Sequence, residues 1–350
     1  MWLSAVSVGI ALLGSSGEEQ TLSSAEQRVW AKVRPSVVTL MQSGVARGIG
    51  VCVDDKGSFL AHRSAVTGPN MFGKLPSGIL IQLRQVAADE TTQLVLVQAV
   101  TALPSPIPAV KLGNEPEKAG GTLLAVLVTG PLRAVFVNGE RYGVVKPSLR
   151  LMPLNELQFE AYSAQIGGGL LFNEEGGLLG VLDATLSLGE PNPQQNVKAA
   201  DTGFGGGGGG LGSLAAPPGA SRIAPTGRGA AVQFGPAPQT VAYSISSSVL
   251  HRVVSGLTGP NRKVLHPAIG VLCRNLDGTG AQVASIVRGS PAEKADLRIG
   301  DIIFSIDGAT IRNQVDVPRV TMRLRIGTQV EVKFRRDGEE KTVMVGVGAG

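Results

Sequence analysis

Between Ser36 and Thr185 the apolar residues fall into short runs, separated by glycine, proline and aspartate. Runs of this length bounded by turn residues predict β-strands, and closely spaced strands are typical of a β-sandwich or a β-barrel. The pattern alone does not choose between these two architectures. The clearest predicted strands are 37–41, 79–83, 123–128, 170–172 and 178–182.

Two segments instead repeat their apolar residues at helical spacing. Residues 25–33 place Val29, Trp30 and Val33 on one face, which predicts a short helix packed on the β-rich part. Residues 247–254 follow a predicted strand at 241–246 and place four apolar residues on one face, with serines available as the N-cap. We expect this second helix to close the β-rich part.

Composition changes sharply at both ends of this region. Residues 187–239 are rich in glycine, proline, alanine, asparagine and glutamine, and such sequence buries too little apolar surface to offset its ordering entropy. They predict a flexible insert, and its glycine run is no phosphate loop because no Gly-Lys-Ser/Thr follows. At the other end, the apolar stretch 1–13 and the small residues after it resemble a secretory signal peptide over 1–20.

Charge, cysteine and histidine content argue against nucleic-acid binding and against metal-dependent functions. Charged residues make up 17% of the chain and the net charge is +5, with no basic helix or aromatic-interleaved basic strip, so we expect no nucleic-acid partner. Cys52 and Cys273 are expected to be free, buried thiols in separate domains. Two cysteines and three scattered histidines offer no metal site, and no cofactor is expected.

Residues 164–173 read Ala-Gln-Ile-Gly-Gly-Gly-Leu-Leu-Phe-Asn. This stretch resembles the Gly-Asn-Ser-Gly-Gly-Pro-Leu motif that carries the attacking serine in trypsin-like proteases of the HtrA type, with Gly167 at the serine position. The resemblance implies a mostly β protein, in which a trypsin-like double β-barrel (21–186 and 240–258) precedes a small α+β PDZ domain (264–350).

The other two catalytic positions are found by the same resemblance. The run from Gly48 to Leu60 is similar to the strands before the catalytic histidine, which places Ser64 at the histidine position. The run from Asp89 to Val97 is similar to the family's Asp-Pro-Lys-Thr-Asp-Leu-Ala-Val-Leu, which places Gln93 at the orienting aspartate.

These replacements remove each function that the reaction needs. A serine hydroxyl attacks a carbonyl when a base takes its proton and a carboxylate fixes that base. Ser64 is no base, Gln93 carries no charge and Gly167 has no side chain. The hypothesis is therefore a protease fold without protease activity. The competing hypothesis is a serine endopeptidase with displaced groups, namely His62, Ser163 and Asp89; His62 is otherwise a surface or partly buried residue at a strand end.

The segment from Ala268 to Gly308 resembles an HtrA-type PDZ domain through Gly-Ser-Pro-Ala, Gly-Asp-Ile-Ile and Asp-Gly at family spacing. Ser290 and Pro291 predict a helix start, Leu297 and Ile299 are expected to be buried, and Gly300-Asp301 is expected to turn into a strand. PDZ domains add an extended peptide as a strand and hold its terminal carboxylate on loop amides.

The resemblance assigns the peptide site. The loop would contain Ala268, Ile269, Gly270 and Val271, and a helix over 316–324 would supply Val317 and Val320 to the side-chain pocket. The implied partners are peptide or protein C-termini and unfolded proteins in the periplasm or cell envelope. A homotrimer, or a mixed oligomer with active relatives, is implied by the resemblance alone.

Overall fold

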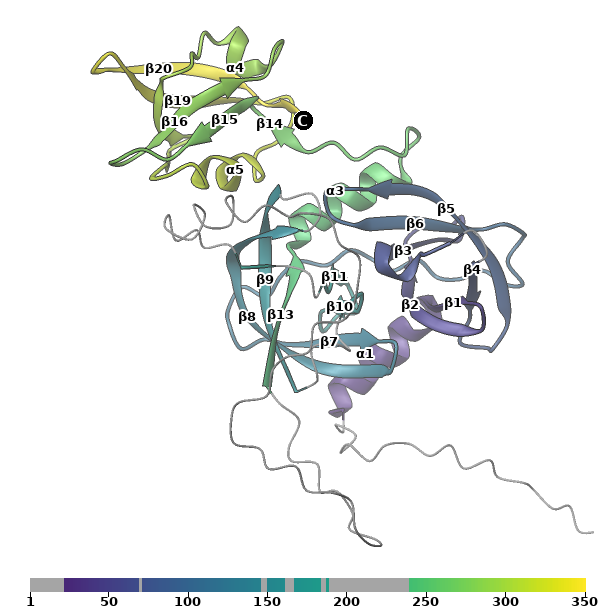
Figure 1. The fold of residues 1–350 in the computed structure, drawn as a ribbon. Helices are drawn as coiled ribbons and strands as arrows, with labels where there is room; N and C mark the ends of the chain where they lie inside the picture. The colour runs from purple at the N-terminus through teal and green to yellow at the C-terminus, as the bar shows by residue number, and fades with distance from the viewer. Residues whose placement is uncertain (1–21, 69–70, 146–149, 161–166, 184–186, 189–238) are drawn as a thin grey trace, which may run out of the picture.

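The computed structural model describes residues 22–68, 71–145, 150–160, 167–183, 187–188 and 239–350. Two β-rich units lie side by side, and a third, smaller unit lies above them in the view of Figure 1. The predicted signal peptide and nearly all of the predicted insert fall outside the described residues.

The first unit is a closed six-stranded barrel in the order β1-β2-β3-β6-β5-β4. All neighbouring strands in it are antiparallel. Its interior holds a compact apolar cluster around Phe59, which is fully buried. The strands are β1 (Val37–Gln42), β2 (Val45–Cys52), β3 (Ser58–His62), β4 (Met71–Lys74), β5 (Leu80–Asp89) and β6 (Leu94–Ala99).

The second unit is a seven-stranded sheet in the order β11-β10-β7-β8-β9-β13, with β12 paired to β8. A bridge between Leu182 and Ser244 joins its two outer strands, so the sheet curls round on itself. The prediction of a double barrel is confirmed. The strands are β7 (Thr122–Leu127), β8 (Gly130–Val145), β9 (Arg150–Glu160), β10 (Leu170–Phe172), β11 (Leu178–Val181), β12 (Ser187–Leu188) and β13 (Gln239–Ile245).

Two helices cover this pair of barrels, and both were predicted from spacing. Helix α1 (Ser24–Val33) begins at a capping box, in which the Ser23 hydroxyl accepts from the Glu26 amide and the Glu26 carboxylate accepts from the Ser23 amide. Short 3-10 turns, η1 (Arg34–Ser36) and η2 (Arg63–Ala65), follow α1 and β3. Helix α3 (Ser247–Thr258) buries its apolar face in a core cluster shared by both barrels.

The third unit has a five-stranded path, β15-β16-β17-β19-β20, with β18 on β17 and a separate β14-β21 pair. Two short helices border it, α4 (Pro291–Lys294) and α5 (Asp316–Thr321). Ser290 caps α4 as predicted, since its hydroxyl accepts from the Glu293 amide. The strands are β14 (Pro267–Ala268), β15 (Val271–Arg274), β16 (Ala281–Ile286), β17 (Ile302–Ile306), β18 (Ala309–Thr310), β19 (Gln329–Arg336), β20 (Glu339–Gly346) and β21 (Gly348–Ala349).

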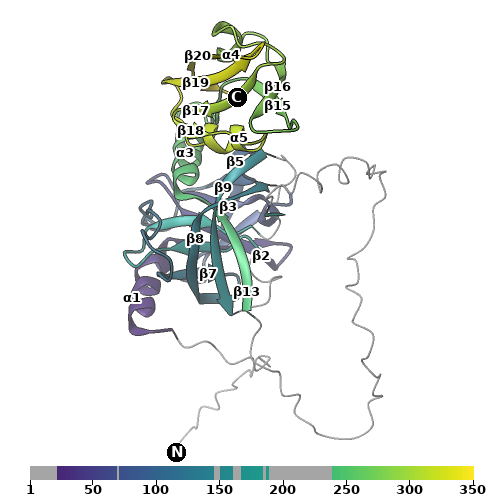
Figure 2. The ribbon, with the colours of Figure 1, turned by 90° about the vertical axis from the view of Figure 1, so that its left-hand side faces the viewer.

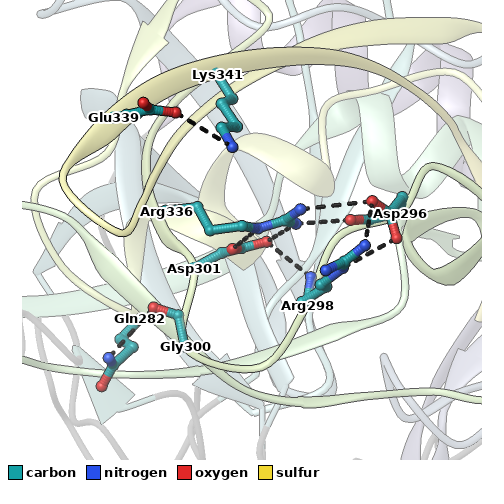
Figure 3. Close-up of polar contacts among 8 residues, drawn as sticks. All are labelled: Gln282, Asp296, Arg298, Gly300, Asp301, Arg336, Glu339 and Lys341. Atoms are coloured by element: carbon teal, nitrogen blue, oxygen red, sulfur yellow. Dashed lines mark hydrogen bonds and ion pairs between the residues drawn. The ribbon is translucent and has the colours of Figure 1, made fainter.

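A charged cluster fixes the turn into β17 (Figure 3). The buried Asp301 carboxylate accepts from the Arg298 amide at 2.7 Å and from Arg336 Nε and Nη2 at 2.7 and 2.8 Å. Hydrogen bonding to Asp301 raises the pKa of Arg336. The expected turn at Gly300 and Asp301 is present, but the predicted burial of Ile299 is wrong. Leu297 enters the core, whereas Ile299 lies in the exposed turn at 70% exposure.

Helix α5 connects the third unit to the second barrel, and both ribbon views place it on the side facing the barrels (Figures 1 and 2). The guanidinium groups of Arg319 and Arg323 lie 4.5 and 5.1 Å from the ring centroid of Tyr142 on β8. Arg252 on α3 donates from Nη2 to the Met322 carbonyl at 3.0 Å. The apolar side chain of Met322 joins the core cluster of the barrels.

A buried hydrogen-bonded pair of a histidine and a carboxylate completes this junction. His266 Nε2, just before β14, lies 3.1 and 3.0 Å from the two carboxylate oxygens of Asp89 at the end of β5. An ionised carboxylate only accepts hydrogen bonds, so Nε2 carries the hydrogen. The Thr92 hydroxyl also donates to Asp89 at 2.6 Å. The side chains of His266 and Asp89 are 2% and 7% exposed. Removing either side chain would therefore leave the other buried without its hydrogen-bond partner.

We predict that His266→Ala lowers the free energy of unfolding by about 3 kcal/mol, because the Asp89 carboxylate stays buried without its hydrogen-bond donor. The measurement is urea denaturation followed by fluorescence, with small-angle scattering to follow the separation of the third unit from the barrels. The control is Lys333→Ala, which breaks the half-exposed pair with Glu331 and should change stability by less than about 1 kcal/mol. Equal effects of the two substitutions would contradict the prediction.

The same pair predicts acid sensitivity. Burial raises the pKa of Asp89, but hydrogen bonds from His266 and Thr92 outweigh burial and hold that pKa below its ordinary value. A carboxylate with a lowered pKa stabilises the fold above its ordinary pKa of about 4, and this contribution is lost as the pH falls through the lowered pKa. Urea midpoints between pH 6 and pH 3 should therefore fall less steeply in Asp89→Asn than in the native chain.

Candidate functional site

Ser64 lies in the η2 turn directly after β3, and its side chain is exposed at the junction of the two barrels. The turn is held by backbone hydrogen bonds from Val66 to the Arg63 carbonyl, at 2.9 Å, and from the Arg63 amide to the Gln93 carbonyl, at 2.8 Å. The turn that contains Ser64 is therefore hydrogen-bonded to the backbone of Gln93. These are the two positions that resemble the family's histidine and aspartate.

Gln93 occupies the β5–β6 turn with a positive φ of 58°. Its side chain folds back onto its own turn, where Nε2 donates to the Glu90 carbonyl at 2.7 Å. Among the described residues this amide makes no contact with an imidazole. Gln93 thus fixes the backbone next to Ser64 but does not orient a base.

Gly167 and Gly168 form a turn close to Ser64. Gly167 is exposed, and Gly168 has a positive φ of 75°, a conformation that glycine adopts without steric cost. A Cβ atom placed on Gly168 would lie 3.5 Å from His62 Cβ and 3.9 Å from Ser64 Oγ. The structure therefore brings Ser64, the backbone of Gln93 and the Gly167-Gly168 turn close together.

His62 ends β3, and only 7% of its surface is exposed, so it is buried rather than a surface residue. Its Nδ1 lies 2.7 Å from Ser64 Oγ, and its Nε2 lies 3.2 Å from Asp183 Oδ2. Asp183, directly after β11, is also buried. Asp183 was not predicted to be a site residue. Its position directly after the predicted strand 178–182 is the one feature of the sequence that could have indicated it.

The displaced endopeptidase hypothesis named other partners for His62. Asp89, the carboxylate in that hypothesis, instead binds His266 and Thr92. Ser163, its nucleophile, lies outside the described residues. In the structure the carboxylate partner of His62 is Asp183.

The second candidate site is the loop between β14 and β15. Ala268 pairs with Gly348, and the carbonyl groups of Ile269 and Gly270 accept hydrogen bonds from the Ala292 and Val287 amides, both at 2.9 Å. Within the described residues the amides of Ile269 and Gly270 donate to no recorded acceptor. Gly270 has a positive φ of 89°, and a Cβ there would lie 2.2 Å from Ser290 Cβ, so only glycine fits.

Strand β15 follows this loop and is an edge strand in the described structure, since it pairs with β16 alone. Val271 is half-buried and packs against the core of the unit, and Leu272 points to solvent at 64% exposure. On α5, Val317 is buried in that core and Val320 is half-buried beside it. The loop and the open edge of β15 are the two features that addition of a peptide as a strand would need.

Neither cysteine forms a disulfide. Burial raises the pKa of the Cys52 thiol to about 11 and that of Cys273 to about 12. In the described part of the chain, no three His, Cys, Asp or Glu side chains are arranged to hold a metal ion. No helix in the described ranges has both the length and the apolar composition of a membrane span.

Comparison with solved structures identifies the architecture. The HtrA-type protease AlgW with a decapeptide superimposes with a TM-score of 0.59 at 15% identity, covering 93% of this chain and 98% of that one. The chain has the HtrA protease fold. A serine endoprotease from Yersinia pestis gives a TM-score of 0.55 at 16% identity, covering 94% of this chain and all of the other.

Sequence comparison adds family information for the C-terminal part of this HtrA-like chain. Residues 267–347 match the PDZ domain family model. A probable periplasmic DegP-like serine endoprotease of Marinomonas sp. (strain MWYL1) is 31% identical over 116 residues, which cover 30% of this chain and 24% of the relative. The corresponding protein of Pseudomonas fulva (strain 12-X) is 39% identical over 69 residues, 20% of this chain and 14% of the relative. The chain thus aligns with a quarter or less of these relatives' lengths.

Proposed function

We propose that this chain is an exported HtrA-like protein that binds peptide C-termini or unfolded segments through its PDZ domain and cleaves no peptide bonds at the family's catalytic positions. Its work would be that of a scaffold, adaptor or regulator in the cell envelope. The observation that carries the proposal is the edge of β15, which is unpaired within the described residues, beside two loop amides for which the same residues offer no acceptor.

The chemistry of the loop favours a terminal carboxylate. Two neighbouring amides that point out of a glycine-containing turn form a concave donor site that suits an anion. An extended peptide would then pair with β15 through its backbone, and its last side chain would face Val271 and Val320. Backbone pairing supplies affinity without sequence preference, which suits a protein that receives many C-termini.

Docking of α5 on the barrel leaves the valines of the proposed groove out of the interdomain contact. Arg319 and Arg323 lie over the ring of Tyr142, whereas Val317 and Val320 pack in the core of the PDZ unit. The interdomain contact and the proposed groove therefore use different side chains of this segment.

The absence of peptidase activity is supported by the residue types at the family's catalytic positions. Gly167 offers no nucleophile, and the Gln93 side chain is bound to the Glu90 carbonyl. The AlgW structures contain peptides, and the curated relatives are named serine endoproteases. For this chain we propose peptide binding without peptide-bond cleavage.

Export and assembly are further parts of the proposal. The segment 1–20 has the character of a signal peptide, and the aligned relatives are named periplasmic. A homotrimer or a mixed oligomer with active relatives would follow from the shared barrel fold. Sedimentation of the purified chain, alone and with an active relative, would measure this.

We predict that a peptide ending in a free carboxylate and apolar residues binds the chain, and that its C-terminal amide binds roughly tenfold or more weakly, because the charge-assisted hydrogen bonds to the loop are lost. Fluorescence polarisation with both peptides measures this. Val320→Lys should remove binding by filling the groove, and Met344→Lys, at an exposed position of β20, is the matched control. Equal affinity for the acid and amide peptides would overturn the carboxylate assignment.

We predict that the native chain leaves an unfolded protein intact, and that the triple substitution Ser64→His, Gln93→Asp and Gly167→Ser produces cleavage. The three positions already lie close together, and aspartate tolerates the positive φ of Gln93 better than most residues. The measurement is gel analysis of casein after incubation, with the Ser64→His and Gln93→Asp double substitution as control. Cleavage by the native chain would contradict the proposed lack of peptidase activity.

A further inference from the structure

A hydrogen-bonded chain joins Ser64, His62 and Asp183, and of these three residues the resemblance had assigned only Ser64 to a catalytic position. Ser64 Oγ lies 2.7 Å from His62 Nδ1, and His62 Nε2 lies 3.2 Å from Asp183 Oδ2. The hydroxyl is exposed, while His62 and Asp183 are 7% and 6% exposed. An exposed nucleophile, a buried base and a buried carboxylate in one line satisfy the geometric test for an activated serine.

The protonation of the imidazole follows from its neighbours. The Ser64 amide, which only donates, lies 3.3 Å from Nδ1, so Nδ1 presents its lone pair. The other ring nitrogen then carries the hydrogen and donates to Asp183. This tautomer leaves Nδ1 free to accept the proton of the Ser64 hydroxyl, and the carboxylate stabilises the imidazolium that results.

We propose that Ser64 is an acyl-accepting nucleophile, with His62 as its base and Asp183 as a positioning residue, and that this site hydrolyses small carboxylic esters. Esters fit better than peptides because an alkoxide leaves more readily than an amide nitrogen. A Cβ atom on Gly168 would lie 3.9 Å from Ser64 Oγ, so glycine at this position keeps a side chain out of contact with the nucleophile.

The reaction balances with water as the only co-substrate. Ser64 Oγ bonds to the ester carbonyl carbon while its proton moves to His62 Nδ1. The bond from that carbon to the alkoxide breaks, and His62 returns the proton to the departing alcohol. A water molecule, deprotonated by His62, then attacks the acyl carbon and releases the carboxylic acid with Ser64 restored.

The test is acetylation by p-nitrophenyl acetate, followed by nitrophenol release and by peptide mapping. We expect the acetyl group on Ser64, a loss of this label in Ser64→Ala, and an unchanged label in Ser105→Ala, which removes an exposed serine in a loop far along the chain. His62→Gln should slow acylation on the order of 100-fold or more. Acetylation of other residues only, or rates unaffected by Ser64→Ala, would overturn the proposal.

Two further measurements separate chemistry from a structural role, since His62 also caps the η2 turn. Asp183→Asn should slow acylation of Ser64, and Asp183→Glu, which keeps the carboxylate, should restore part of the rate; equal losses in the two variants would mean that Asp183 has a purely structural role and would overturn its assignment as a positioning residue. In Ser64→Cys the introduced thiol should react with iodoacetamide faster than Cys52 and Cys273, whose pKa values burial raises to about 11 and about 12.

An unreactive thiol in Ser64→Cys, in a chain with native thermal stability, would also overturn the proposal. The PDZ groove lies in another unit, so Ser64→Ala should bind a C-terminal peptide like the native chain. Failure of ester hydrolysis would therefore leave peptide binding intact, and failure of peptide binding would leave acylation of Ser64 intact.

Discussion

The buried pair of Asp89 and His266 is the interaction that joins the parts of this molecule. It connects the end of β5 in the first barrel to the segment that leads into the PDZ domain. The turn that begins at Asp89 ends at Gln93, whose carbonyl holds the η2 turn through the Arg63 amide. One five-residue turn therefore contacts both the PDZ linker and the turn that contains Ser64.

Three arginine side chains, those of Arg252, Arg319 and Arg323, add further contacts around this pair. Desolvation lowers the pKa of Arg252, whose guanidinium donates to the Met322 carbonyl from a largely buried position. The guanidinium groups of Arg319 and Arg323 both lie over the ring of Tyr142, which is buried. Buried charges tolerate loss of a partner poorly, so the junction favours one arrangement of PDZ domain and barrels over a freely moving tether.

The local spacing of apolar residues predicted the helices and strands. It did not predict the side-chain pairs between residues far apart in the sequence. The apolar spacing at 29–33 and 249–254 gave helices α1 and α3, and the glycine-bounded apolar runs gave the strands. The pairs of His62 with Asp183 and Asp89 with His266 join residues 121 and 177 positions apart. Periodicity carries no information about such pairs, because barrel closure and domain docking bring the residues together. Ile299 was predicted to be buried because its side chain is apolar. The turn directs this side chain into solvent, which apolar character alone does not indicate.

The two thiols have a consequence for the compartment in which the chain would work. With a pKa of about 11, Cys52 exists as thiolate in roughly one molecule in ten thousand at neutral pH, and Cys273 in fewer. Thiolates are the species that exchange with disulfides. In the folded protein both thiols would therefore exchange slowly with disulfides in an oxidising environment.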